Sequence, residues 1–221
     1  MARRDERSLG DVRAELRTRL GFVHRGSASS VQDALLDSFI AEAQETLVWE
    51  VDFPVLRREH SEHTIAGERL YDLPDDCDAR RVRAVAVALA GVWRDMEQGI
   101  EPAQDTYRDV ISFPYLWDMI EGQLELYPTP GTTYPLRVDY YALPAPLTKH
   151  DQRLAIDSRL VFLQALTVAK AHYRQPDAEA VGALMQSKLR NLKAGSHIEQ
   201  RYSRLRPRRR NVHSAIRPVM V

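Results

Sequence analysis

The chain is poor in cysteine and has no long apolar run. Its 221 residues contain one cysteine, Cys77, so no disulfide can form within the chain, and folding needs no oxidising compartment. The longest apolar stretch, residues 84–93, is too short to cross a bilayer, and we expect no membrane partner. Residues 1–7 are polar and no apolar run follows them, so we expect no signal peptide and folding in the cytosol.

Sequence signatures of catalysis and of cofactor binding are missing too. There is no glycine-rich phosphate-binding loop and no Gly-x-Ser-x-Gly motif. Cys77 has no histidine close to it in sequence, so a small buried side chain is the expected role. His60 and His63 lack the third ligand that a tight metal site needs, and on a strand they would face opposite sides. We predict no catalytic residue, no metal and no cofactor.

Neighbouring carboxylates leave one chemical alternative, an acid–base pair. An acid–base pair needs one buried carboxyl group with a shifted pKa. The candidates lie in polar stretches typical of solvated turns, so we expect no such pair among them. They are Asp75 with Asp76, Glu97 with Glu101, and Asp118 with Glu121.

Charge of one sign is concentrated at the C-terminal end. The formal net charge is zero, from 31 basic and 31 acidic residues. Residues 200–221 hold seven arginines and no acidic residue, which leaves 24 basic and 31 acidic residues elsewhere. A basic tail on an acidic body indicates a partner that is either nucleic acid or an acidic protein surface.

Hydrophobic periodicity predicts helices near both ends. Ser8 is a candidate N-cap for a short helix to Leu20, with Gly21 as its stop. Ser30 precedes a long helix over 31–50, whose apolar positions follow a 3.6-residue period. Two further helices are predicted, from Asp157 or Ser158 to about 174, and over about 178–198. The apolar stripe of the last one is Val181, Leu184, Met185, Leu189 and Leu192.

The middle of the chain is a turn-rich β region, with seven of the twelve prolines between 102 and 146. We predict a hairpin over 63–71 and one strand over 81–93. A second hairpin is expected over 113–127, with its turn at Glu121-Gly122. A further strand is predicted over 134–143, and a helix or loop over 95–110.

The expected fold class is α+β. The N- and C-terminal segments form a helical bundle, with a small antiparallel β domain between them and an extended basic C-terminal tail. The expected divisions are 1–55 and 148–202 for the helices, 56–147 for the β domain and 203–221 for the tail. The tryptophans are expected in the core or in contacts between subunits. They are Trp49, Trp93 and Trp117.

Several pieces of the chain, taken in order, resemble one known family. They are Glu68-Arg-Leu-Tyr-Asp-Leu-Pro-Asp-Asp-Cys77 with Arg81-Val-Arg-Ala-Val85, Leu124-Glu-Leu-Tyr-Pro-Thr-Pro130, Leu136-Arg-Val-Asp-Tyr-Tyr-Ala-Leu-Pro-Ala-Pro-Leu147, Ala169-Lys-Ala-His-Tyr173 and Pro176-Asp-Ala178. This series resembles the head-to-tail adaptors of podoviruses, the tail tubular protein A or head completion and gatekeeper type, over roughly residues 30–195. The resemblance rests on the order and spacing of the pieces.

The resemblance implies a structural protein of the virion neck, assembled in the cytoplasm of the host bacterium. Adaptors of this kind form twelvefold rings of identical subunits below the portal protein. They extend the channel through which genomic DNA passes, and they seat the tail nozzle or fibres. It also implies that the helical part faces the portal and that C-terminal segments reach along a neighbour or the portal.

The arginine-rich tail has three interpretations. It docks in an acidic groove of the portal, it binds the phosphates of channel DNA, or it is a solvated end without a partner. Apolar residues after the arginines favour portal docking, because a tail that only binds DNA has no need of them. The portal-binding candidates are Arg204, Leu205, Arg206, Arg208, Arg209, Arg210, Ile216, Arg217, Val219 and Val221. The alternative function is a monomeric DNA-binding accessory protein that uses the same tail.

Overall fold

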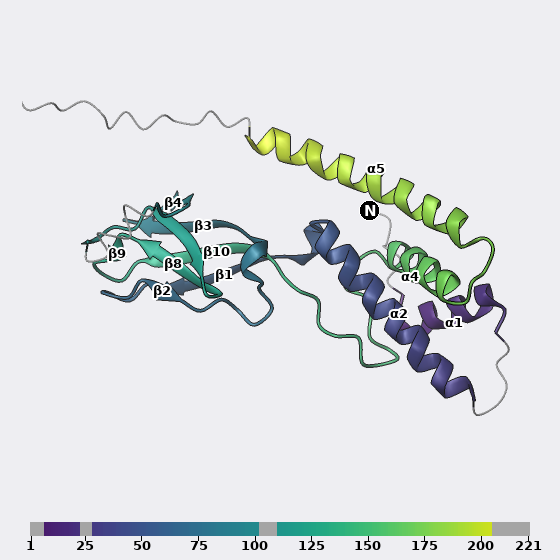
Figure 1. Ribbon diagram of the computed structural model, residues 1–221. Coiled ribbons are helices and arrows are strands. Elements are labelled where there is room, and N and C mark those ends of the chain that lie inside the picture. Colours follow the sequence, from purple (N-terminus) through teal and green to yellow (C-terminus); the bar gives the residue numbers. More distant parts are fainter. Residues whose placement is uncertain (1–6, 23–27, 102–109, 205–221) are drawn as a thin grey trace, which may run out of the picture.

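The computed structural model describes residues 7–22, 28–101 and 110–204, and Figure 1 shows them as two bodies joined end to end. One body is a bundle of helices from both ends of the sequence. The other is a β body from the middle of the sequence. The α+β class predicted from the sequence is confirmed.

Helices α1 and α4 begin at the predicted capping residues, whereas α2 begins at Ala28, before Ser30, which was expected to precede it. Helix α1 (Leu9–Leu20) starts at a reciprocal capping box between Ser8 and Asp11, and it stops at Gly21 in a left-handed conformation with φ of 76°. Helix α2 spans Ala28–Glu50. Helix α4 (Ser158–His172) is capped by the Asp157 carboxylate, which accepts from the backbone N–H of Arg159. Helix α5 spans Ala178–Arg204, six residues beyond the predicted end.

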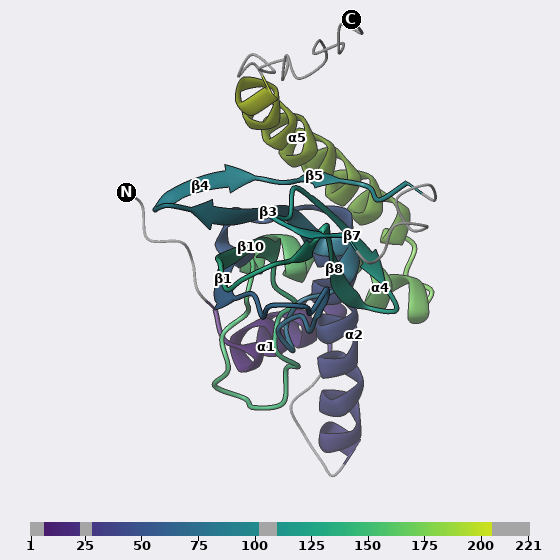
Figure 2. The same ribbon diagram turned by 90° about the vertical axis from the view of Figure 1, so that its left-hand side faces the viewer.

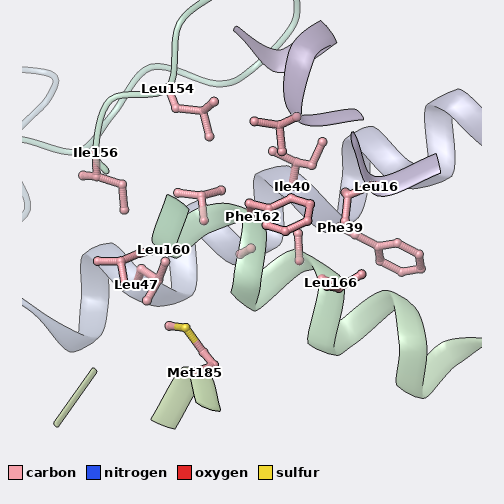
Figure 3. Packing of buried hydrophobic residues seen from close by; sticks show 14 of the residues in the cluster. Leu16, Phe39, Ile40, Leu47, Leu154, Ile156, Leu160, Phe162, Leu166 and Met185 are labelled. Carbon is pink, nitrogen blue, oxygen red and sulfur yellow. The ribbon is translucent and has the colours of Figure 1, made fainter. Parts of the chain in front are cut away.

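The apolar stripes of these helices meet in one core. Helix α4 lies between α2 and α5, and α1 packs on both α2 and α4. Figure 3 shows Met185 reaching from α5 toward Leu160 of α4 and Leu47 of α2. The core of the bundle therefore draws on segments more than a hundred residues apart in the sequence. Its fully buried members include Val12, Leu16, Leu36, Ile40, Leu47, Val48, Val161 and Ala165.

The β body contains two four-stranded sheets and one short pair of strands. One sheet has the order β1-β10-β3-β4 and the other β2-β8-β7-β5, while β6 pairs with β9. All pairings are antiparallel except β5 with β7 and β6 with β9. The strands are β1 (Arg57–His63), β2 (Leu70–Tyr71), β3 (Val82–Leu89), β4 (Val92–Asp95), β5 (Glu97–Gln98), β6 (Ile111–Ser112), β7 (Leu116–Ile120), β8 (Gln123–Tyr127), β9 (Thr129–Pro130) and β10 (Pro135–Tyr141).

A second core fills the β body. Alternate residues of β10 are buried, namely Leu136, Val138 and Tyr140, as the period-2 pattern of this strand predicted. Leu124 and Leu126 of β8 are buried in the same cluster. The two cores are separate, so the β body is stabilised by its own apolar burial.

Two of the predicted β elements are wrong. The segment 63–71 is not a hairpin, because β1 pairs with β10 whereas β2 pairs with β8 of the other sheet. The segment 81–93 is not one strand but a hairpin of β3 and β4, which turns at Ala90 and Gly91 with φ of 50° and 78°. Alanine seldom adopts a left-handed conformation, so the sequence carried no clear turn signal there.

The predicted hairpin over 113–127 is confirmed from Leu116 to Tyr127. Strands β7 and β8 pair on either side of Glu121 and Gly122, whose φ angles are 51° and 86°. Two successive positive φ values suit the right-handed twist of a two-residue hairpin. Of the segment 95–110, predicted as a helix or loop, β5 is a strand and residues 102–109 lie outside the described residues.

The β body is an insertion between α2 and α4 whose two connections run side by side. The backbone N–H of Ala142, just after β10, donates to the carbonyl of Leu56, just before β1, at 2.9 Å. The chain therefore leaves the bundle and returns to it at one place. Figure 2, turned by 90°, shows the β body in front of the bundle, with α2 and α5 running in the same direction behind it.

Candidate functional site

The structure reaches the predicted portal-binding segment only at its first residue. Arg204 is the last residue of α5. The other candidates, from Leu205 to Val221, lie outside the described residues. Their role stays a prediction, and what the structure adds is the helix that carries them.

Helix α5 is fixed to the bundle from its first turns as far as Lys193. Met185 and Leu189 are buried in the core that α5 shares with α4 and α2. The ammonium of Lys193 lies 2.8 Å from the carboxylate of Glu50 at the end of α2. These contacts hold α5 in one direction on the bundle.

A buried lysine secures the turn between α4 and α5. Lys170 is buried, and its Nζ donates to both carboxylate oxygens of Asp177 at 2.7 and 2.6 Å and to Oε1 of Gln175 at 3.0 Å. The hydrogen bond from Lys170 lowers the pKa of Asp177 below its ordinary value. The amide of Gln175 also donates to the carbonyl of Leu20, which ties this turn to the end of α1.

This ion pair predicts a pH dependence of stability. Because the folded protein lowers the pKa of Asp177, the pair stabilises the fold at pH values above about 4, the ordinary pKa of an aspartate. The contribution is lost as the pH falls through the lower folded-state value. We expect Asp177→Asn to be less stable than the parent at neutral pH and to lose less stability on acidification. Urea midpoints between neutral and acidic pH would measure this, with the exposed Asp151→Asn as control. Parallel curves for parent and Asp177→Asn would contradict it.

Only part of the apolar stripe predicted for α5 is used within the chain. Met185 and Leu189 are buried, whereas Leu184 is 50% exposed and Leu192 is 36% exposed. Small or uncharged residues surround Leu184 on the outward side of the helix, at Ala180, Ala183, Ser187 and Asn191. Leu184 is therefore exposed among small and uncharged residues, on a helix that also exposes the charged residues Glu179 and Arg190.

Three arginines of the β body hold the end of α2, and sequence reasoning missed them. The guanidinium of Arg80 lies over the ring of Trp49 at 4.5 Å. Arg83 forms an ion pair with Asp52, just after α2. Arg81, between them, donates from Nη1 to the carbonyl of Val48 and from Nε to the carbonyl of Tyr141 at 3.0 Å. The only signal in the sequence was the string Arg-Arg-Val-Arg at the start of a strand, which is equally typical of a solvated strand end.

Arg81 is the buried member of this arginine cluster. Its side chain joins the bundle to β10, and the residue is 6% exposed. Val48 lies in the last turn of α2, where carbonyls have no partner within the helix and carry a partial negative charge. Burial lowers the pKa of the Arg81 guanidinium, and the nearby carboxylates of Asp52 and Asp78 oppose this. Its Nη2 is buried and has no hydrogen-bond partner among the described residues.

The residues considered for chemistry do not come together in the described part of the chain. Cys77 is half-buried, and burial raises the pKa of its thiol to about 11, so it is not an activated nucleophile. His60 lies 3.9 Å from Glu62, while His63 is exposed at the end of β1. Among residues 7–22, 28–101 and 110–204, no three histidine, cysteine or acidic side chains gather in a way that could hold a metal ion.

The tryptophans divide between core and surface. Trp117 is buried in the β body as predicted, whereas Trp49 is 47% exposed and Trp93 is 42% exposed. The guanidinium of Arg137 lies over the Trp93 ring at 4.7 Å.

Among the described helices, none combines the length and the apolar character that a membrane span requires.

The sequence matches the model of one protein family, described as SU10 adaptor protein, over residues 7–211. The chain belongs to the SU10 adaptor protein family. The match takes in the whole bundle, the β body and the first arginines after α5. This member of the family is a phage head-to-tail adaptor, a structural protein of the particle and not an enzyme.

Other comparisons add little to this assignment. No curated protein matches the SU10-type adaptor. Among solved structures, one similar chain comes from the "Neck of empty GTA particle computed with C6 symmetry". It is 17% identical, with a TM-score of 0.28, and the match covers 75% of the adaptor and 83% of that chain. A likeness this weak carries no argument about the adaptor's fold or assembly.

Proposed function

We propose that this adaptor is the subunit of a ring, twelvefold as the resemblance implies, that binds the portal of a podovirus. The ring extends the channel for genomic DNA and seats the tail nozzle or fibres. The observation that carries the proposal is the family match over 7–211, which includes the helical bundle and continues into the arginine-rich segment. The assembly is completed in the cytoplasm of the host.

We propose that the segment after α5 docks on the portal. Helix α5 is anchored at its start by Lys170 and along its length by Met185 and Leu189, so the segment leaves a rigid support. The arginines supply attraction to an acidic groove, and Leu205, Ile216, Val219 and Val221 supply apolar anchors. Ordering such a segment costs conformational entropy, so docking should occur only on the matching partner.

The charge distribution favours this over the DNA-binding alternative. Residues 56–147 hold 16 acidic and 9 basic residues, so the β region as a whole repels a nucleic acid backbone. A protein that binds DNA through seven arginines alone should lose its affinity steeply as salt rises. Portal docking with apolar anchors should withstand moderate salt.

The direct test is electron microscopy of the purified adaptor mixed with its cognate portal ring, beside the adaptor alone. We expect an added symmetric layer below the portal, whose symmetry gives the stoichiometry. Binding of the free protein to DNA, with no added layer, would instead support the monomeric accessory protein.

Deletion of residues 203–221 should abolish portal binding and leave a folded subunit. The deletion removes only the last two residues of α5, which lie beyond the contacts that fix this helix to the bundle. Circular dichroism should therefore match the parent, while portal decoration in micrographs is lost. Normal decoration by the truncated protein would contradict docking through this segment.

A further inference from the structure

We infer that α5 of one subunit packs against α2 of the next subunit in the ring. The inference rests on the proposed ring, and it names the two surfaces that meet. A ring of identical subunits needs two different complementary surfaces on opposite sides of each subunit. The bundle offers two such surfaces, and each carries charges that form no ion pair with any residue that the structure describes.

The first surface is the outward side of α2, called here the α2 face. It consists of Ala34, Ser38, Glu42, Glu45 and Trp49, which are all exposed and recur every three or four residues along the helix. Neither glutamate forms an ion pair with any residue that the structure describes. The α2 face is thus acidic at Glu42 and Glu45, and it ends at the half-exposed ring of Trp49, over which the Arg80 guanidinium lies.

The second surface is the outward side of α5, called here the α5 face. It consists of Ala180, Leu184, Ser187, Arg190 and Asn191, again all exposed and on one side of the helix. Within the described residues, the Arg190 side chain makes one polar contact: its Nε donates to the carbonyl of Gln186, on the same helix, at 3.4 Å. The α5 face is thus basic at Arg190, and it carries the 50% exposed Leu184 six residues before that charge.

The two faces point away from each other. Both α2 and α5 pack on α4, and the residues of the two faces are exposed, so they lie on the sides of the two helices turned away from α4. One subunit cannot bring its own two faces together. Two subunits side by side can, with α5 of one against α2 of the other.

The direction of the helices also agrees with such a contact. Helices α2 and α5 run in the same direction along the bundle (Figures 1 and 2). If the bundle lies along the ring axis, rotation to the next subunit preserves this direction, so the two helices meet in parallel. In the parallel arrangement that places Arg190 opposite Glu42, Leu184 falls between the small residues Ala34 and Ser38 of the neighbour. Ser187 then falls one residue past the position opposite Ser38.

The net charges of the N-terminal and C-terminal helical segments are also opposite in sign, like those of the two faces. Residues 1–55 hold 7 basic and 10 acidic residues, whereas residues 148–199 hold 8 basic and 5 acidic residues. Neighbouring subunits placed side by side would therefore meet with opposite charge. Complementary charge of this kind selects the register of a contact more than it adds affinity.

Cysteine cross-linking of the assembled ring tests the contact. In a Cys77→Ser background, Ser38→Cys and Ser187→Cys are introduced together into the full chain, and the protein is assembled on portal and oxidised. We expect a ladder of covalent multimers on a non-reducing gel. Ser38→Cys with Ser61→Cys is the matched control, because Ser61 is exposed on β1 of the β body and should give no ladder.

Charge reversal gives a second measurement that does not depend on the cross-link. Glu42→Lys and Arg190→Glu should each raise the protein concentration needed for ring assembly, on the order of tenfold. Together they should restore assembly, because the pair is re-formed with its signs exchanged. Glu97→Lys, a reversal at an exposed position of β5, should assemble like the parent.

The outcomes separate this contact from the ring itself. Rings on the portal in micrographs, with no ladder and no rescue by the double reversal, would overturn the contact and leave the proposed function in place. Cross-linking of Ser187→Cys to the portal rather than to a second subunit would also overturn it. A failure of unmodified protein to form any layer on the portal would overturn both.

Discussion

Replacement of Arg81 by alanine is expected to destabilise the protein by about 2–4 kcal/mol. The guanidinium is the only buried charged group in the arginine cluster, and it donates to the carbonyls of Val48 and Tyr141, one from each body. Hydrogen bonds from a charged donor contribute roughly 1.5–3 kcal/mol each, and the substitution leaves both carbonyls without this donor. Urea unfolding followed by circular dichroism would measure the loss.

Two further variants at the junction separate burial from charge. Arg83→Ala removes an ion pair between two half-exposed side chains, so it should cost less than about 1 kcal/mol. Arg81→Met keeps most of the volume but none of the donors, so its stability should lie between that of the parent and that of Arg81→Ala. If Arg81→Ala unfolds at the same urea concentration as the parent, the guanidinium does not stabilise the junction.

The second large effect is expected from Leu136→Ala in the β body. Leu136 is fully buried in β10, which pairs with β1 on one side and β3 on the other. Truncation of a fully buried leucine costs about 2–5 kcal/mol, from lost apolar burial and from the cavity left behind. The fluorescence of Trp117, buried in the same core, should report the change.

A matched control for Leu136→Ala exists on the surface of the bundle. Leu184→Ala removes the same atoms from a side chain that is half exposed, so stability should change by no more than about 0.5 kcal/mol. The isolated subunit would then tolerate Leu184→Ala while the assembled ring is weakened. A loss below about 1 kcal/mol for Leu136→Ala would show that the β body does not rely on this core.

The helices could be predicted from the sequence because their signals are local. Ser8, Asp157 and Gly21 stand at helix ends where their side chains or backbone conformations are needed, and the apolar period of each helix runs unbroken between them. The strand pairing could not be predicted, because pairing depends on partners far apart in the sequence. Glu59 opposite Asp139 is an example, since no local pattern indicates that β1 joins β10.

The functional surfaces could likewise be predicted from the sequence only in part. The arginine-rich segment was visible as composition, and the family match reaches into it as far as residue 211. The role of Arg81 was not visible, because a buried arginine and a solvated one look identical in sequence. The outward apolar residue Leu184 was read as part of a core stripe, and only the position of α4 shows that it faces away from the bundle.

The insertion of the β body between α2 and α4 also has a consequence for synthesis on the ribosome. Helix α2 ends at Glu50, but its main packing partner begins only at Ser158. At roughly 5–20 residues per second, the apolar side of α2 waits about 5–20 seconds for that partner. During this interval the nascent chain exposes Leu36, Ile40 and Leu47, while the β body can already fold around its own core. During this interval the exposed apolar side of α2 can bind chaperones or lead to aggregation.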